Sequence, residues 1–149
     1  MRSRRSAREW ALRVLYATRL TGYPVEQCFD DVLKDAKEDQ NLGFCRKLCT
    51  HVASGDEKID ESIRRAVQKW DLARLAVIDL IILRMAIAEF LYFDDIPYKV
   101  TINEAIELAK EYSTAQSGRF VNGILDAVCA DLKKNDPRKQ KLETEAEPR

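Results

Sequence analysis

The chain has 149 residues, and its 25 lysines and arginines balance 25 aspartates and glutamates, so the formal net charge is zero. This length and an ordinary globular composition predict one domain with a single core. Zero net charge argues against a nucleic-acid binder that is cationic over its whole surface. The most apolar stretch, residues 72–93, is interrupted by charged residues. A membrane span needs roughly 20 mostly uncharged residues, so this stretch predicts a buried helix and no membrane association.

The charge is unevenly distributed along the chain. Before Leu20 six arginines face a single acid, Glu9, whereas acids outnumber lysines between Glu26 and Asp39. A protein that is neutral overall but basic at one end can bind a polyanion locally without coating it. The N-terminus has basic residues but lacks an uncharged apolar segment and a small-residue cleavage site. We therefore expect no secretory signal and a cytoplasmic protein.

Helical spacing of apolar residues predicts three helices in the first part of the chain. The first is expected to begin at a capping box formed by Ser6 and Glu9 and to end at Gly22. Pro24 suits the first turn of the second helix, and the third is expected to stop near Gly55. The apolar stripes of the three helices are Trp10, Ala11, Val14 and Leu15; Val25, Cys28, Phe29, Val32 and Leu33; and Phe44, Cys45, Leu48, Cys49 and Val52.

Two further helices occupy the middle of the chain. The apolar stripe of the fourth helix starts at Ile59 and is completed by Trp70. The fifth helix, expected from about residue 73 to residue 92, is apolar on nearly every side. That pattern is typical of a central helix that is wrapped by the others.

The last two helices are predicted between Thr101 and Lys133. Thr101 and Glu104 have capping-box spacing at the start of the sixth helix, and the seventh is expected from near Ser117 to about Lys133. The sequence therefore predicts an all-α fold of about seven helices in one domain, residues 1–134. Residues 135–149 form a charged tail with little to bury, and we expect this tail to be disordered.

Patterns for catalysis and for metal binding are weak. The single histidine, His51, has no obvious carboxylate or serine partner in the sequence, so we expect no catalytic residue and no enzyme. Cys45 and Cys49 would share a helix face, which two metal ligands could exploit, but no CxxC pair occurs. Because cysteine is among the most buried residue types, we expect reduced core thiols and no metal. The five glycines are isolated, so no phosphate-binding loop or cofactor is expected.

The basic start of the chain is the first candidate RNA site. Arg2, Arg4 and Arg5 are expected to precede the helix cap, and Arg8 to lie in the first turn. Cationic side chains beside the exposed N–H groups of a helix start suit phosphate oxygens. The alternative is a solubilising terminus, because basic residues are common at chain ends.

The segment from Pro97 to Asp126 reads PYKVTINEAIELAKEYSTAQSGRFVNGILD, and helix formation does not require its two asparagines or its Arg–Phe pair. It closely resembles the transcription antitermination factor NusB family, all-helical RNA-binding proteins of bacteria. Further segments match that family's order and spacing: RRSAREWALRVLYATRLTG, FCRKLCTHVASGDEKID and WDLARLAVIDLIILRMAIAEF. Little of the resemblance lies between Tyr23 and Asn41 or after Leu132, and Ser6 interrupts what is often a longer arginine run.

The resemblance implies a compact bundle of two small helical subdomains that share the fifth helix. It implies binding to boxA, a short U-rich single strand of nascent ribosomal RNA transcripts, together with the ribosomal protein NusE. That complex joins RNA polymerase and suppresses premature termination. Whether the free protein is a monomer or a homodimer stays open.

The resemblance also adds site residues. Arg119 and Phe120 match a cation–aromatic pair that lies beside the RNA in the family, and an aromatic ring can stack on an unstacked base. For Phe120 the equal alternative is core packing, and for Trp70, a further RNA candidate, it is the apolar stripe of its helix. Tyr16 and Asp79 match the family's NusE-contacting tyrosine and acid, although Asp79 could be an ordinary polar break in an apolar helix.

Two other functions remain open. A NusB-like domain also forms the N-terminal part of certain ribosomal RNA cytosine methyltransferases, where it helps to hold the substrate. This chain has no Rossmann-type glycine fingerprint and no cysteine nucleophile motif after the seventh helix, which argues against that enzyme. The other function is that of a helical protein-interaction module without RNA binding.

Overall fold

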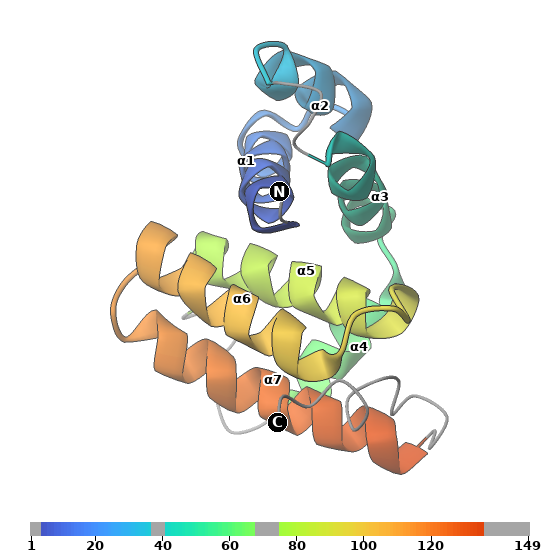
Figure 1. The fold of residues 1–149 in the computed structure, drawn as a ribbon, viewed down its shortest axis with the longest axis vertical. Helices are drawn as coiled ribbons and strands as arrows, with labels where there is room; N and C mark the ends of the chain where they lie inside the picture. The colour runs from blue at the N-terminus through green and yellow to red at the C-terminus, as the bar shows by residue number, and fades with distance from the viewer. Residues whose placement is uncertain (1–3, 37–40, 68–74, 136–149) are drawn as a thin grey trace. The chain divides into compact units, whose positions relative to one another are not determined.

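The computed structural model describes residues 4–36, 41–67 and 75–135. These residues form seven α-helices and no strand, which confirms the predicted all-α fold (Figure 1). Arg2, Trp70 and the predicted tail beyond Asn135 lie outside the described residues. The helices are α1 (Arg4–Thr21), α2 (Val25–Leu33), α3 (Leu42–Ala53), α4 (Glu57–Ala66), α5 (Val77–Tyr92), α6 (Tyr98–Tyr112) and α7 (Ser117–Asn135).

The chain divides into two compact units between Asp56 and Glu57. Helices α1 to α3 form the first unit and α4 to α7 form the second. The resemblance implies two helical subdomains that share α5, and the sharing of α5 stays a prediction. Helix α5 belongs to the second unit, because its apolar surface packs mainly on α4, α6 and α7.

In the first unit, α1 packs against both α2 and α3. The thiol of Cys49 on α3 donates to the carbonyl oxygen of Ala11 on α1 at 3.8 Å. Gly22 adopts a left-handed φ of +76° and its N–H donates to the Thr18 carbonyl at 2.9 Å, so it ends α1 as predicted. The core side chains of this unit are Ala7, Ala11, Leu12, Val14, Leu15, Cys28, Phe29, Leu33, Cys45, Leu48 and Cys49.

In the second unit, α5 is buried along almost its whole length. The side chains of Ile82, Leu83 and Phe90 are completely buried, and the Phe90 ring meets the Tyr98 ring edge-on with 4.9 Å between centroids. Buried carboxylates are tolerated in such a helix only where they are hydrogen-bonded. Glu89 meets this condition, because the Thr101 hydroxyl donates to its Oε1 at 2.8 Å.

Three predicted helix starts are wrong. Helix α1 begins at Arg4, so Ser6 lies inside it and cannot adopt the extended conformation of a cap. Helix α6 begins after Pro97, whose extended ψ of 146° sets the entry, so Thr101 lies one turn inside and bonds Glu89 instead of capping. Helix α5 begins at Val77 rather than near residue 73, because Ala76 is extended with a ψ of 146°.

Among the residues described, no helix is both long enough and apolar enough to cross a membrane. Cys28, Cys45, Cys49 and Cys129 are free and buried, so the predicted burial of the four thiols is confirmed.

Candidate nucleic-acid interface

The arginines at the start of α1 are held against an aromatic ring of the same unit. The guanidinium carbons of Arg4 and Arg8 lie 4.8 Å and 5.3 Å from the centroid of Phe44 on α3. A cation is attracted to the face of an aromatic ring. Stacking uses the face of the guanidinium, whereas a phosphate bonds its in-plane N–H groups, so the two contacts are compatible. The arrangement fixes basic side chains at one end of α1.

The position of these arginines differs from the prediction in one respect. Arg4 and Arg5 lie inside α1 instead of preceding it, and Arg8 lies in the second turn rather than the first. Arg4 and Arg5 are exposed, whereas only 5% of Arg8 is exposed. The aliphatic part of Arg8 is thus packed into the unit, and Arg4 and Arg5 are the more accessible cations.

Sequence reasoning missed Phe44, because its helical spacing placed it on the inner stripe of α3. It is half-buried and supports two arginines of α1. The same arrangement recurs in this unit, where the guanidinium of Arg13 lies 5.1 Å from the centroid of a Trp10 ring and that of Arg46 lies 3.9 Å from the Phe29 ring centroid. Arg46 also pairs with Glu26 of α2. The sequence could have indicated only the Arg13 contact, because Arg13 and Trp10 are three residues apart in one helix. The other arginines contact rings on a different helix.

The predicted Arg–Phe pair lies in the first turn of α7. Arg119 is exposed and Phe120 is half-buried, so part of the Phe120 ring faces solvent. Gly118, just before them, lies close to α6: a Cβ at this position would be 3.2 Å and 3.3 Å from side-chain atoms of Lys110 and Ile106, which would have to shift. This close approach sets α7 tightly against α6.

Asp79 on α5 fixes the start of α7. Its Oδ2 accepts a hydrogen bond of 2.9 Å from the Ser117 hydroxyl, and that hydroxyl also lies within 3.0 Å of the Ser113 and Thr114 hydroxyls. Only 6% of Asp79 is exposed, and within the described part of the chain its buried Oδ1 has no hydrogen-bond partner. The carboxylate therefore anchors a turn two residues before Arg119, and its assignment to a partner contact stays a prediction.

Tyr16, the other residue assigned to a partner, lies on α1 in the first unit. It is 37% exposed, and Leu20, one turn later, is 66% exposed. Tyr23 in the following turn is 51% exposed. Tyr16 and Leu20 are four residues apart in α1 and so lie on one face of it, and exposed apolar side chains on one face are a feature of protein contact surfaces.

The thiols and the histidine show features of structural residues. A hydrogen bond with Cys45, together with burial, raises the pKa of the Cys49 thiol. A thiol is a metal ligand and a nucleophile only as the thiolate, which this environment disfavours. Burial, followed by the charge of Lys47, lowers the pKa of His51. Among residues 4–36, 41–67 and 75–135, no group of three or more His, Cys, Asp or Glu side chains could hold a metal ion.

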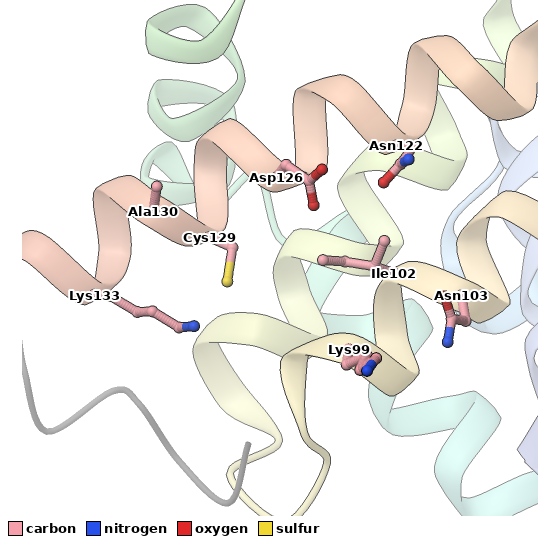
Figure 2. A pocket seen from close by; sticks show the side chains of 8 residues that line it. All are labelled: Lys99, Ile102, Asn103, Asn122, Asp126, Cys129, Ala130 and Lys133. Atoms are coloured by element: carbon pink, nitrogen blue, oxygen red, sulfur yellow. The ribbon is translucent and has the colours of Figure 1, made fainter. Parts of the chain in front are cut away.

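The second unit also contains a hollow of about 580 Å³ beside α6 and α7 (Figure 2). The hollow was not predicted from the sequence, because it depends on how α6 and α7 pack against each other. Five of its eight lining residues carry polar or charged groups, and the lining consists of Lys99, Ile102, Asn103, Asn122, Asp126, Cys129, Ala130 and Lys133.

A family model described as the NusB family matches residues 5–130 of the chain. The chain belongs to the NusB family. Relatives named "Transcription antitermination protein NusB" include one from Chloroherpeton thalassium, which is 44% identical over 136 residues that cover 88% of this chain and 63% of that protein. The relative from Natranaerobius thermophilus is 40% identical, over 89% of this chain and 98% of that protein. The chain thus spans less than two thirds of the first relative and nearly all of the second.

Solved structures show the same fold as this NusB family member. A structure described as "T. maritima NusB" superposes with a TM-score of 0.77 at 36% identity, covering 88% of this chain and 94% of that chain. A structure described as "Antitermination Factors NusB and NusE in complex with dsRNA" superposes with a TM-score of 0.77 at 27% identity, over 86% of this chain and 96% of that chain. Another, described as "a Plectonemic RNA Supercoil", superposes with a TM-score of 0.80 at 28% identity, covering 89% of this chain and 97% of that chain.

Proposed function

We propose that this protein is a non-enzymatic RNA-binding antitermination factor, which binds the boxA element of nascent ribosomal RNA transcripts together with NusE. The observation that carries this proposal is the set of arginines on α1 that are held over Phe44 in a chain of zero net charge. Membership of the NusB family supports it. So does the likeness to a solved complex of NusB and NusE with double-stranded RNA.

Phosphates supply most of the affinity in this proposal. Arg4 and Arg5 are exposed near the start of α1, where cationic side chains and helix N–H groups suit phosphate oxygens. Phosphate contacts release counterions, so the affinity should fall as the salt concentration rises. Arg119 adds a cation in the second unit, and the exposed part of the Phe120 ring offers a surface for stacking of an unpaired base.

The partner surface is proposed on Tyr16 of α1, with Asp79 of α5 as a second contributor. Replacing Tyr16 by alanine should weaken NusE binding and leave the protein's own RNA binding intact, because Tyr16 lies about two turns beyond Arg8 on α1. Val100→Ala is the matched control, since Val100 is a similarly exposed apolar residue of the second unit. For Asp79 the suitable change is asparagine, because its amide oxygen can still accept from Ser117 while the charge is removed.

The proposed function is tested by equilibrium binding of the full chain to three RNAs: single-stranded boxA, a scrambled strand and a boxA duplex, each with and without NusE. We expect weak, salt-dependent binding by the protein alone, a preference for the U-rich single strand, and tighter binding when NusE is present. Equal affinity for duplex and single strand would remove the stacking role of Phe120. Failure to bind any RNA at low salt, even with NusE, would refute the RNA-binding function.

If the RNA and NusE contacts are confirmed, the same complex is proposed to join RNA polymerase in the cytoplasm and to suppress premature termination. This step can be measured separately, as readthrough of a terminator placed downstream of boxA in a reconstituted transcription reaction. Readthrough should depend on this protein, on NusE and on an intact boxA. Unchanged termination in the presence of an RNA-bound protein would contradict the antitermination role alone.

A further inference from the structure

The hollow beside α6 and α7 has the volume of a small-ligand site. Its volume of about 580 Å³ lies within the roughly 300–1,000 Å³ that is usual for sites of small ligands. Figure 2 shows Asp126, Cys129 and Lys133 reaching from α7 into the space beside α6. Lys133 is held there in part by Tyr98, since its ammonium lies 5.6 Å from the centroid of that ring.

Two asparagines line this hollow, Asn103 in the interior of α6 and Asn122 in the interior of α7. Asparagine is a poor helix former, because its amide competes for backbone hydrogen bonds. Both residues are exposed, and within residues 4–36, 41–67 and 75–135 neither side-chain amide has a hydrogen-bond partner. Helix formation therefore does not explain why two amides lie here. A ligand that needs a hydrogen-bond donor and an acceptor would explain them.

Gly123 is a second residue that local packing does not explain. It lies in the interior of α7, where glycine is among the least favourable residues, and a Cβ at this position would meet nothing within 4 Å. The contrast with Gly118 is direct, because a Cβ there would press on Lys110 and Ile106. A glycine beside Asn122 leaves the backbone of α7 open to close approach from outside.

The hollow continues the exposed face on which Arg119 lies. Arg119, Asn122, Asp126 and Lys133 follow one another at intervals of three, four and seven residues, which places them on one side of α7. The distance along the helix axis from Arg119 to Lys133 is about 21 Å at 1.5 Å per residue. A strand that meets Arg119 and Phe120 at the start of α7 would reach the hollow by following this face.

We propose that the hollow binds a ribonucleotide unit of the RNA, beyond the part that contacts Phe120. Lys99 and Lys133 bind its phosphates, and the amides of Asn103 and Asn122 bond the edge of its base. An amide offers both a donor and an acceptor and is a usual side chain for reading base edges, while Asp126 accepts from a base N–H. This inference rests on the proposed RNA-binding function. It adds a nucleotide that the second unit binds, beyond the one that contacts Phe120.

A protein segment fits the hollow less well. The centre of a protein interface is apolar and depleted in charged residues. Here three of the eight lining residues are charged and two are asparagines. The two lysines against one aspartate also favour an anionic ligand.

The test compares two double variants of the full chain, Lys99→Ala/Lys133→Ala and the matched control Lys58→Ala/Lys134→Ala. Both remove two lysines from the second unit, but only the first pair lines the hollow. Affinity for single-stranded boxA RNA is measured over a range of salt concentrations. The hollow pair should flatten the salt dependence by about 0.7 for each phosphate that the variant no longer binds, and the control pair should not change it. Asn122→Ala should weaken binding about fivefold, whereas Asn135→Ala should not.

The outcomes separate this inference from the function on which it rests. If the natural protein binds RNA and the two double variants give the same salt dependence, the hollow is not a nucleotide site and the RNA-binding function stands. If the natural protein binds no RNA with or without NusE, the function itself fails. If the hollow pair no longer binds NusE and keeps its RNA affinity, a protein occupies the hollow and the inference is overturned.

A titration followed by NMR of the asparagine side-chain amides identifies the source of the ribonucleotide. Shifts of the Asn103 and Asn122 signals with RNA, and much weaker ones with uridine monophosphate, support a nucleotide that is part of the strand. Shifts that are as strong with uridine monophosphate would assign the hollow to a free nucleotide and overturn its assignment to the RNA strand. The absence of shifts with either ligand would overturn the site.

Discussion

Arginine has different contacts in the two units of this protein. In the first unit the guanidinium groups of Arg4, Arg8 and Arg13 lie over aromatic rings, and that of Arg46 lies over Phe29 and also pairs with Glu26. In the second unit Arg65 pairs with Asp131 and Arg84 with Asp60, each at 3.1 Å. An ion pair cancels the charge of its arginine locally, whereas an aromatic ring holds the arginine without cancelling its charge. The ring contacts of the first unit therefore position arginine side chains by a different interaction from the ion pairs of the second.

The interiors of the two units differ as well. The first unit buries short apolar stripes with three of the four cysteines, while the second unit is built around α5, which is apolar on nearly every side. The second unit also buries the carboxylates of Asp79 and Glu89, each with a hydroxyl donor. We therefore expect changes in the interior of the second unit to affect stability, and changes on the arginine face of the first unit to affect RNA binding.

The largest effect is expected for Phe90→Ala. Phe90 is fully buried and packs edge-on against Tyr98, so the substitution should lower the free energy of unfolding by about 3–5 kcal/mol. Chemical denaturation measures it, with Tyr23→Ala as the control, because Tyr23 is half exposed in the first unit. A decrease below about 1 kcal/mol would mean that α5 is not the centre of the core.

Thr101→Val is expected to cost about 1–3 kcal/mol, because it removes the hydroxyl that donates to the buried carboxylate of Glu89. Thr50→Val is the matched control. The Thr50 hydroxyl only bonds the Arg46 carbonyl within its own exposed helix turn, so its removal should change stability by no more than about 0.5 kcal/mol. Equal destabilisation of the two variants in thermal melts would show that the buried hydrogen bond is unimportant.

Phe120→Ala tests whether a half-buried ring in the second unit serves the RNA or the core. If the ring stacks on a base, RNA binding should weaken by about 1–3 kcal/mol while the melting temperature hardly changes. If it is core, stability should fall by about 3–5 kcal/mol and RNA affinity should follow only through unfolding. Melting curves and RNA-binding curves of this variant distinguish the stacking role from the core role. A large drop in melting temperature would remove Phe120 from the proposed RNA site.

The smallest effect is expected for Gly123→Ala, which should stabilise the protein by about 0.5–1 kcal/mol. Alanine is the better helix former, and its Cβ at this position meets nothing within 4 Å. Gly118→Ala should lack this gain, since its Cβ would press on Lys110 and Ile106. Denaturation of the two variants side by side checks the prediction, and a destabilised Gly123→Ala variant would show that α7 is packed more tightly there than described.

Apolar periodicity predicted the number and order of the helices, because each helix must bury one face. It did not predict where α1 and α6 begin, since a serine or threonine followed by glutamate can also lie inside a helix. Thr101 shows why: its hydroxyl is used by Glu89, which is twelve residues away, and local sequence does not reveal that contact. The start of α5 was misplaced for a similar reason, because Ala76 carries no signal that it is extended.

For the candidate site, the sequence identified the basic side chains but not what holds them. Arg4 and Arg8 stand out in the sequence, whereas their support by Phe44 depends on how α3 packs against α1. Likewise, Asn103 and Asn122 stand out as residues that helix formation does not require. Their common position beside one hollow follows only from the packing of α7 against α6.

The most direct test of the basic region compares Arg4→Ala/Arg5→Ala with Arg64→Ala/Arg65→Ala. Each removes two positive charges, the first pair from the start of α1 and the second from arginines that pair with Glu61 and, for Arg65, with Asp131. Affinity for single-stranded boxA RNA is measured over a range of salt concentrations. We predict that only the Arg4/Arg5 variant binds more weakly, with a salt dependence that flattens by about 0.7 for each phosphate that it no longer binds. Equally weakened binding by both folded variants would show that net charge, and not the basic region of the first unit, governs RNA binding.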